Sequence, residues 1–175
     1  ASTPDDILQA QKIIFPGVGS FDRAMEKISE LGIRQALDVM ATQKKIPFLG
    51  VCLGMQLLTD RSNEGILPGL GWISGQTKRF AFPEGSPLKI PHMGWNEAYP
   101  QKNATLFQGA APQARYYFVH SYFVSTASTG DIAATTDYGG HFTSAIQHEN
   151  IFGVQFHPEK SLRHGMRILE NFVRL

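Results

Sequence analysis

One cysteine of the sequence has a glycine two residues before it and another two residues after it, in the segment Gly50–Gly54. This segment lies where an apolar run meets an amphipathic stretch. The run 47–51 predicts a short buried strand, and the stretch 53–59 predicts a helix. A side chain at either glycine would collide with the neighbouring strand or helix, so small residues at this spacing are typical of a sharp strand-to-helix turn. The segment therefore predicts that Cys52 lies on such a turn, with its thiol projecting from the edge of a sheet.

The rest of the chain alternates short apolar runs with helical patterns, and its second half is rich in strands. Helices are expected at residues 2–8, 20–31, 33–42, 53–59 and 161–173. Buried or alternating strands are expected at 12–15, 47–51, 72–80, 114–123, 132–136, 142–148 and 151–156, the last two joined by a hairpin at Glu149 and Asn150. This order predicts an α/β fold of three layers, in which a mixed, mostly parallel sheet carries helices on both faces.

Capping residues mark three of the expected helix starts. A Ser2–Thr3 cap precedes Pro4, Ser20 caps the second helix, and Ser161 caps the last one. The last helix is expected to bury one apolar face, made of Leu162, Met166, Leu169, Phe172 and Val173.

Composition limits the classes of function. The 175 residues fit a single domain, 1–175, and a 42% hydrophobic content is enough for a core of that size. Sixteen basic and fifteen acidic side chains, with no basic cluster, disfavour a nucleic-acid binder. One cysteine cannot form an internal disulfide, and the sequence has neither a secretory leader nor an apolar stretch of membrane-spanning length. We therefore expect a cytoplasmic protein that does not insert into a membrane.

Cys52 itself has two interpretations. A lone cysteine is usually a small buried hydrophobic residue. The flanking glycines favour a nucleophile, whose thiolate would be stabilised by the amides and dipole of the helix that begins behind it. In that interpretation the amide of Leu53 can also point at an oxyanion.

A nucleophilic thiol needs a base, and His157 is the histidine with an orienting partner. Pro158 keeps His157 in extended backbone, and Glu159 lies two residues on, which is the same side of an extended chain. The carboxylate can accept from one imidazole nitrogen while the other nitrogen faces the thiol, as in a triad in the chain order Cys, His, Glu. A His-x-Glu pair alone is more often an exposed surface pair.

Metal binding is not supported by the spacing of ligands. The single cysteine and the five other histidines show no close-spaced pattern: His92, His120, His141, His148 and His164. We expect no metal and no cofactor.

The segment Pro16–Gly19 is a glycine-bearing turn directly after an expected strand. It lacks the third glycine of a dinucleotide fingerprint and the lysine of a phosphate loop, so a nucleotide role is disfavoured. Its amides would suit a second oxyanion donor opposite Leu53, although a plain tight turn explains the segment equally well.

Five segments carry a family resemblance: Pro16–Gly19, Gly50–Gln56, Pro91–Asn96, Val119–Tyr122 and Gly153–Ser161. Together they resemble the class I glutamine amidotransferases, which implies the flavodoxin-like fold of that family. More narrowly, they are similar to the glutaminase subunits of imidazole glycerol phosphate synthases in histidine biosynthesis, and the Pro91–Asn96 segment separates these subunits from their relatives.

The resemblance implies an enzyme that hydrolyses glutamine to glutamate and ammonia through a thioester on Cys52. By the same likeness, His157 moves protons and Glu159 holds the imidazole, while Val18 and Leu53 supply the oxyanion amides. The residues that would line the glutamine pocket are Gly17, Gln56, Glu64, Ser121 and Tyr122.

The resemblance also implies a partner. The ammonia would pass to a cyclase subunit, a (β/α)8 barrel, and Trp95, Asn96 and Lys160 match positions that face it. Simpler explanations are a core position for Trp95 and a solvated charge for Lys160.

Members of this family normally begin with a strand, a glycine turn and a helix, about 30 residues in all, before the equivalent of Ser2. We therefore expect the chain to be truncated at its N-terminus relative to the family. Loss of a central strand would leave neighbouring strands unpaired and one wall of the pocket open.

Three alternatives stay open at this stage. The ammonia could go to an amidotransferase that modifies surface-polysaccharide sugars. A hydrolase of γ-glutamyl peptides would have no synthase partner, and Trp95 and Asn96 speak against it. The chain could also be a non-catalytic, partner-binding homologue.

Overall fold

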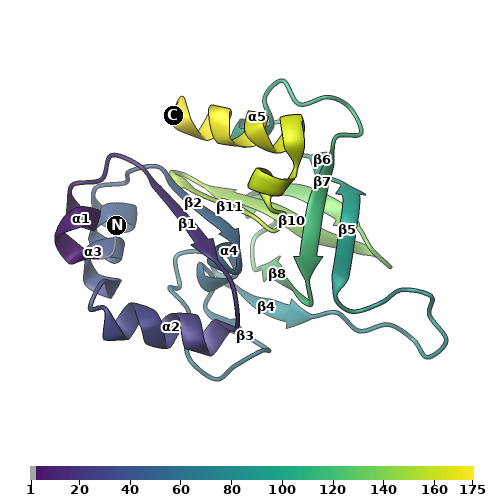
Figure 1. Ribbon diagram of the computed structural model, residues 1–175, viewed down its shortest axis with the longest axis horizontal. Helices are drawn as coiled ribbons and strands as arrows, with labels where there is room; N and C mark the ends of the chain where they lie inside the picture. Colours follow the sequence, from purple (N-terminus) through teal and green to yellow (C-terminus); the bar gives the residue numbers. More distant parts are fainter. Residues whose placement is uncertain (1–2) are drawn as a thin grey trace.

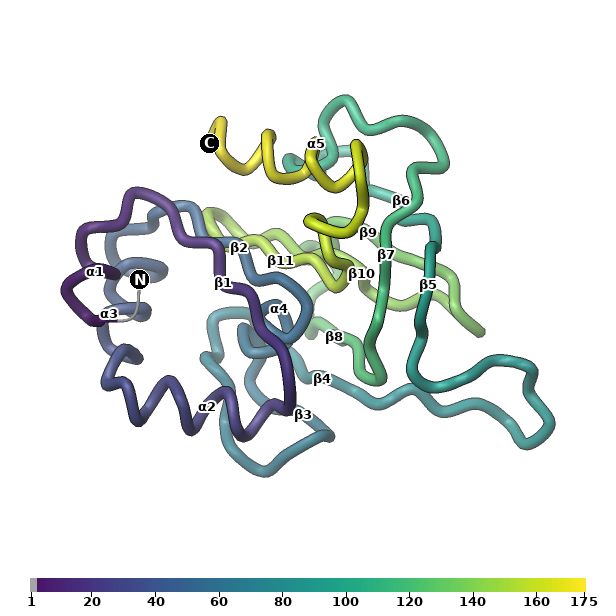
Figure 2. The backbone as a smooth tube through the Cα atoms, in the orientation of Figure 1, coloured from purple at the N-terminus to yellow at the C-terminus, as the bar shows by residue number. Residues whose placement is uncertain are grey.

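A computed structural model describes residues 3–175 of the protein. Its central element is a mixed sheet. Its main path runs in the order β1 (Ile13–Gly17), β2 (Phe48–Cys52), β11 (Ile151–Val154), β10 (His141–His148), β8 (Tyr122–Thr126), β4 (Gly75–Arg79) and β3 (Arg61–Ser62). Beside this path, β9 (Ile132–Asp137) pairs with β10 and with β6 (Tyr99–Pro100). A separate two-stranded sheet joins β5 (His92–Glu97) to β7 (Arg115–His120). Figure 2 shows these two strands side by side at one end of the main sheet.

Parallel pairing is concentrated where the chain crosses over through helices. Strand β2 pairs in parallel with β1 on one side and with β11 on the other. Strands β3 and β4 are also parallel. The other pairs of the described strands are antiparallel, including the expected hairpin between β10 and β11. The α/β class and the mixed sheet are confirmed, with more antiparallel pairing than the sequence indicated.

Five α-helices of the described chain surround the sheet: α1 (Pro4–Leu8), α2 (Phe21–Glu30), α3 (Arg34–Asp38), α4 (Leu53–Leu57) and α5 (Leu162–Val173). A π-helical turn, Val39–Gln43, continues α3, and 3-10 turns lie at Thr105–Phe107, Thr129–Asp131 and Pro158–Lys160. Figure 1 shows α1 to α3 at one end of the molecule and α5 on the opposite side of β2 and β11.

Alternation along β2 separates two cores. Phe48 packs with Phe21 and Leu37 of the helices on one face. Its neighbour Leu49 packs with Phe118 and Ile168 on the other face. Because successive side chains of a strand point to opposite faces, this alternation produces the three layers expected from the sequence.

The buried face of α5 differs from the expected one. Ile168 and Phe172 are buried, but Leu162 is 71% exposed and Met166 is 51% exposed. The helix approaches the turn Pro158–Lys160 so closely that a side chain at Gly165 would overlap the Pro158 carbonyl. The buried face of the helix therefore includes Gly165, which the apolar pattern of the sequence does not mark. The predicted face was wrong for Leu162, Met166 and Val173.

Strand β1 is longer and less buried than expected. It continues through Pro16 and Gly17, which pair with Val51 and Cys52. Ile14 is 46% exposed because β1 lies at the edge of the sheet among the described strands. The expected fully buried strand at 12–15 was therefore wrong in its burial but right in its place.

The helix starts are capped differently from the prediction in two cases. Thr3 and Asp6 form a reciprocal capping box at α1, whereas Ser2 lies outside the described residues. The Ser20 side chain makes no cap bond, and Glu64 accepts from the first amide of α2 instead. Ser161 likewise makes no side-chain cap bond to α5.

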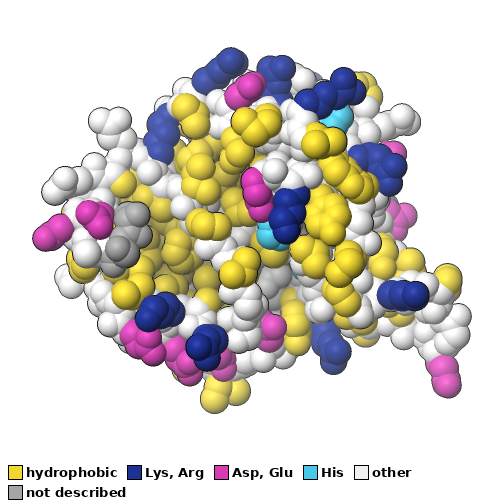
Figure 3. Space-filling model, viewed as in Figure 1, with side chains coloured by type: hydrophobic (Ala, Val, Ile, Leu, Met, Phe, Trp, Pro, Cys, Tyr) yellow, Lys and Arg dark blue, Asp and Glu magenta, His cyan; other side chains and the backbone are white. Residues whose placement is uncertain are grey.

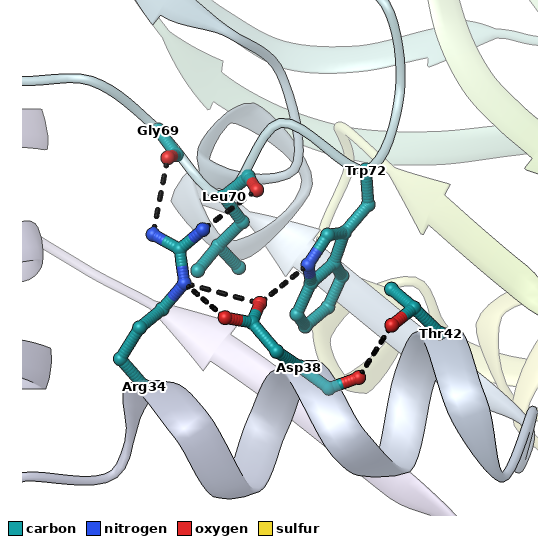
Figure 4. Close-up of polar contacts among 6 residues, drawn as sticks. All are labelled: Arg34, Asp38, Thr42, Gly69, Leu70 and Trp72. Atoms are coloured by element: carbon teal, nitrogen blue, oxygen red, sulfur yellow. Dashed lines mark hydrogen bonds and ion pairs between the residues drawn. The ribbon is translucent and has the colours of Figure 1, made fainter.

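One polar cluster ties α3 to the loop that follows α4 (Figure 4). Asp38 accepts from Arg34 Nε at 2.8 Å and from the indole nitrogen of Trp72 at 2.8 Å. The same guanidinium donates to the carbonyl oxygens of Gly69 and Leu70 at 3.3 and 2.9 Å. These contacts satisfy carbonyl groups of an irregular segment and hold it against the helix.

The second half contains strands that the sequence did not indicate. The expected strand 114–123 is divided at Ser121 into β7 and β8, which belong to different sheets. Strand β5, which contains a glycine at position 94 with a φ of +129°, was not expected at all. Interior glycine is unusual in a strand, and the polar residues of this segment hide its period.

Candidate active site

The turn that carries Cys52 has the geometry expected of it. Cys52 has φ +56° and ψ −113°, a strained backbone conformation for a residue with a side chain. A side chain at Gly50 would come within 2.6 Å of the Gly54 carbonyl oxygen, and one at Gly54 would overlap the carbonyl of Phe15. The two glycines are therefore required by close approach of the backbone, as the sequence predicted.

The turn at Gly17 packs directly on the cysteine turn. A side chain at Gly17 would come within 2.6 Å of the Gly54 nitrogen and 2.9 Å of the Leu53 side chain. Val18 follows with its side chain 86% exposed. The amide of Leu53 hydrogen-bonds the thiol of Cys52. The two amides expected to bind an oxyanion thus belong to adjoining turns at one edge of the sheet.

His157 and Glu159 lie at this same edge. Strand β11 is parallel to β2, with Val154 opposite Val51, so the residues after β11 emerge beside Cys52. His157 Nδ1 lies 2.7 Å from Glu159 Oε1. His157 is buried, whereas the Glu159 side chain is 54% exposed. The carboxylate occupies one imidazole nitrogen and leaves Nε2 as the nitrogen available to a thiol.

Burial disfavours the charged form of the Cys52 thiol. Burial raises the pKa of Cys52 to about 11, more than the hydrogen bond from the Leu53 amide lowers it. The charges of Glu159 and Lys160 act in opposite directions on the same pKa. The expected thiolate, stabilised by a helix N-terminus, was therefore wrong, because α4 has only five residues and desolvation outweighs its amides. A base is needed to remove the proton.

Gln56 lies beneath the site. Its side chain is 5% exposed, and its Nε2 donates to the Tyr122 carbonyl and to Gln155 Oε1, both at 3.0 Å. Gln155 Nε2 in turn lies 3.8 Å from Cys52 Sγ. Sequence reasoning missed Gln155, although a glutamine within the apolar run 151–156 is a signal of a buried polar contact.

The other residues expected in the glutamine pocket lie in two places. Glu64 Oε2 accepts from the Phe21 amide at 2.8 Å, so this carboxylate caps α2 next to the turn at Gly17. Ser121 forms the bend between β7 and β8, where its carbonyl accepts from Phe80 at 3.1 Å. Tyr122 begins β8 and is half-buried.

Three residues form an aromatic and cationic cluster near His157. The Trp95 and Tyr117 rings meet edge to face with centroids 6.0 Å apart, and Lys160 Nζ lies 5.9 Å from the Tyr117 centroid. His157 donates its backbone amide to the Tyr117 carbonyl at 2.9 Å. Trp95 is 39% exposed, which excludes the core position considered from the sequence.

A cavity of about 890 Å³ lies along β1. It is lined by α1 and α2 and reaches Gly17 and Val18 at one end. Figure 3 shows hydrophobic side chains gathered across the face over α1, α2 and β1. Cys52 is not among the residues that line this cavity.

Two kinds of site are absent from the described residues 3–175. No group of three or more His, Cys, Asp or Glu side chains in this range is arranged to hold a metal ion. No helix there is long and apolar enough to span a bilayer.

A half-buried cysteine on a strained strand-to-helix turn, at the same sheet edge as a histidine paired with a carboxylate, is the kind of arrangement that acyl transfer through a thiol requires. Residues 2–175 match the family model of class I glutamine amidotransferases, and the chain belongs to this family.

Individual relatives point to a narrower group than the family model does. The chain is 47% identical over 174 residues to imidazole glycerol phosphate synthase subunit HisH of Leptospira interrogans, covering 99% of this chain and 85% of that one. The same subunit of Bdellovibrio bacteriovorus is 44% identical, with 98% and 85% covered.

Solved structures confirm the fold class. A glutamine amidotransferase crystal structure matches with a TM-score of 0.74 at 17% identity, covering 99% of this chain and 83% of that one. The glutaminase domain of Trypanosoma brucei CTPS, with bound acivicin, matches with a TM-score of 0.66 at 20% identity, covering 98% and 74%.

Proposed function

We propose that this protein is the glutaminase subunit of an imidazole glycerol phosphate synthase, acting in histidine biosynthesis. It hydrolyses glutamine and passes the ammonia to a cyclase subunit, a (β/α)8 barrel. The observation that carries this proposal is 47% identity to a HisH subunit over 174 residues. We further propose that residues 1–175 form one glutaminase domain and that the protein works in the cytoplasm.

In the first half-reaction His157 Nε2 removes the proton of the Cys52 thiol. The sulfur forms a bond to the side-chain amide carbon of glutamine, and the carbonyl electrons move to the oxygen. The amides of Leu53 and Val18 stabilise this oxyanion. When the intermediate collapses, the C–N bond breaks and the imidazolium gives its proton to the departing ammonia.

In the second half-reaction His157 takes a proton from water, and the hydroxide oxygen attacks the thioester carbon. The C–S bond then breaks, glutamate leaves, and the sulfur regains a proton. Glu159 accepts from the imidazole throughout, holds its tautomer and stabilises its charged form. The raised pKa of Cys52 explains why catalysis depends on this base.

The structure suggests different tasks for the pocket residues. Gly17, Ser121 and Tyr122 would line the glutamine pocket. They would contact the glutamine with backbone atoms and with the ring of Tyr122. Gln56 and Glu64 have side chains already engaged within the protein, so we propose that they shape the pocket by holding Tyr122 and the turn at Gly17.

Trp95, Asn96 and Lys160 would form part of the surface that meets the cyclase. Support comes from exposed apolar side chains on β5 itself and on β6, since Met93 is 61% and Tyr99 is 46% exposed. A row of exposed large apolar residues beside a cation is typical of an interaction site.

The test is glutamine hydrolysis by the full-length protein with and without a cyclase subunit of imidazole glycerol phosphate synthase. We expect slow hydrolysis alone and marked stimulation by the cyclase. Fast hydrolysis without a partner would contradict the coupling. Absence of stimulation, with normal labelling of Cys52 by a glutamine analogue, would favour a different synthase as recipient.

A further inference from the structure

A hydrogen-bond path leads away from the Cys52 thiol into the protein. Gln155 Nε2 donates to Cys52 Sγ across 3.8 Å, and Gln155 Oε1 accepts from Gln56 Nε2 at 3.0 Å. The second hydrogen of the Gln56 amide goes to the Tyr122 carbonyl at 3.0 Å. The first steps of the path are therefore made by two buried amides that end on a backbone oxygen.

Two buried histidines continue the path on the other side of that oxygen. The Tyr122 carbonyl lies 2.7 Å from His120 Nδ1. His120 Nε2 lies 3.0 Å from His92 Nδ1, and His92 Nε2 lies 3.3 Å from Asn96 Nδ2. Asn96 is half-buried on β5. The path thus joins the strand that carries Trp95 to the thiol.

The direction of every histidine bond is fixed by the ends of the path. The Tyr122 carbonyl can only accept, so His120 carries its hydrogen on Nδ1 and accepts on Nε2. His92 must then donate from Nδ1 and accept on Nε2. Asn96 supplies that donor, because its Nδ2 also donates to the carbonyl of Asp137 at 2.9 Å, which fixes the orientation of its amide.

The packing around His92 and His120 disfavours a positive charge on either ring. His92 stacks on Tyr138 with centroids 3.9 Å apart and on Phe118 at 4.8 Å, and His120 packs against Phe80 at 5.3 Å. Burial lowers the pKa of His92 to about 4 and that of His120 to about 3. Both rings are therefore neutral at neutral pH, as the sequence of donors and acceptors requires.

We propose that His92 and His120 are positioning residues for the nucleophile. They hold the Tyr122 carbonyl, and through it the two glutamines that keep an amide donor on the Cys52 thiol. Since the outer end of the path is Asn96, a contact made at β5 changes the donor at the sulfur. This inference rests on the proposed function, in which Cys52 is the nucleophile.

The test uses alkylation of the full-length protein by iodoacetamide, because Cys52 is the only cysteine of the sequence given. Below the pKa of the thiol, the alkylation rate follows the thiolate fraction, so a rise in that pKa slows the reaction. We expect Gln155→Leu to slow alkylation at pH 8.5 about fivefold, as for loss of one ordinary hydrogen bond. His120→Phe and Asn96→Ala should slow it about threefold, since each loosens the donor without removing it.

Matched controls separate the path from general damage. His141→Phe makes the same change at an exposed histidine of β10. Asn171→Ala removes an amide that likewise donates twice, to the carbonyls of Leu106 and Gln108. Both controls should alkylate at the unsubstituted rate, with the same pH profile.

Equal rates for His120→Phe, Asn96→Ala and the controls would overturn the proposal, as would slowing by the controls alone. If His120→Phe does not fold, nitrogen-15 NMR of the unsubstituted protein decides. The expected signature is a hydrogen on Nδ1 of both His92 and His120, and a hydrogen on Nε2 of either ring would refute the path. Neither readout uses glutamine, so failure of the glutaminase assay is a separate result.

Discussion

The burial of His120 makes the stability of this protein depend steeply on pH, and His120→Phe should remove part of that dependence. Burial lowers the pKa of His120 from 6.5 to about 3, and the ring is 6% exposed. The unfolded chain takes up a proton at this residue as the pH falls below 6.5, whereas the folded protein does not. The stability due to the neutral ring is therefore fully present above pH 6.5 and is lost as the pH falls towards 3.

The size of the effect follows from the two pKa values. One unit of pKa difference is worth 1.36 kcal/mol, so between pH 6 and pH 4 the unsubstituted protein loses about 2.5 kcal/mol through His120 alone. A phenylalanine at this position does not titrate. Its ring keeps the contacts with Phe80 and Phe118, although the protein loses the hydrogen bonds to Tyr122 and from His92 at every pH.

Urea unfolding at pH 4, 5, 6 and 7, followed by tryptophan fluorescence, measures the difference. From pH 6 to pH 4, the unfolding free energy of the unsubstituted protein should fall by about 2.5 kcal/mol more than that of His120→Phe. His141→Phe, at an exposed position, serves as the control. A gap for His120→Phe that stays constant over this range would refute the assignment of a buried, neutral His120.

Three further predictions test the fold. Gly54→Ala should cost at least about 2 kcal/mol in urea unfolding, because the new side chain would overlap the carbonyl of Phe15, and an unchanged midpoint would count against the tight turn. Ile168→Ala should cost about 2–5 kcal/mol and Met166→Ala less than about 0.5 kcal/mol, since only the former is buried; equal losses would contradict the buried face of α5. Asp38→Ala should cost about 1–2 kcal/mol by removing the acceptor of a guanidinium and an indole, and a thermal midpoint that does not fall would show that this cluster contributes nothing.

The strand-to-helix turn could be predicted in detail because the spacing of its small residues is visible in the sequence. The glycine at 50 is needed by backbone contacts with Gly54 and Met55, and the glycine at 54 by the carbonyl of Phe15 on the adjacent strand β1. The bond between His157 and Glu159 is likewise a matter of extended chain over two residues. Both features depend on spacing, which a sequence displays directly.

The predictions that were wrong or missing concern features set by residues far apart in the sequence. The raised pKa of Cys52 comes from burial by distant segments, which outweighs the local amide of Leu53. The face of α5 is set by the approach of Gly165 to Pro158, and no apolar periodicity reports it. The same holds for Gln155, whose side-chain partners Cys52 and Gln56 lie in β2 and α4 and are brought to it only by the sheet.

The pairing of His92 with His120 shows the same limit. The two residues are 28 positions apart, and they meet because β5 and β7 pair in antiparallel register with His92 opposite His120. The segment containing His92 was recognised only through its family resemblance, and nothing in its local pattern predicted a strand.

If Cys52 releases the ammonia that a cyclase subunit uses, Cys52→Ala separates the two nitrogen sources of the complex. In the complex with that subunit, synthesis would be measured once with glutamine and once with an ammonium salt as the nitrogen source. We expect the variant to lose glutamine-dependent synthesis and to retain ammonia-dependent synthesis at the unsubstituted rate. Retention of glutamine-dependent synthesis, or equal loss of both, would contradict the account.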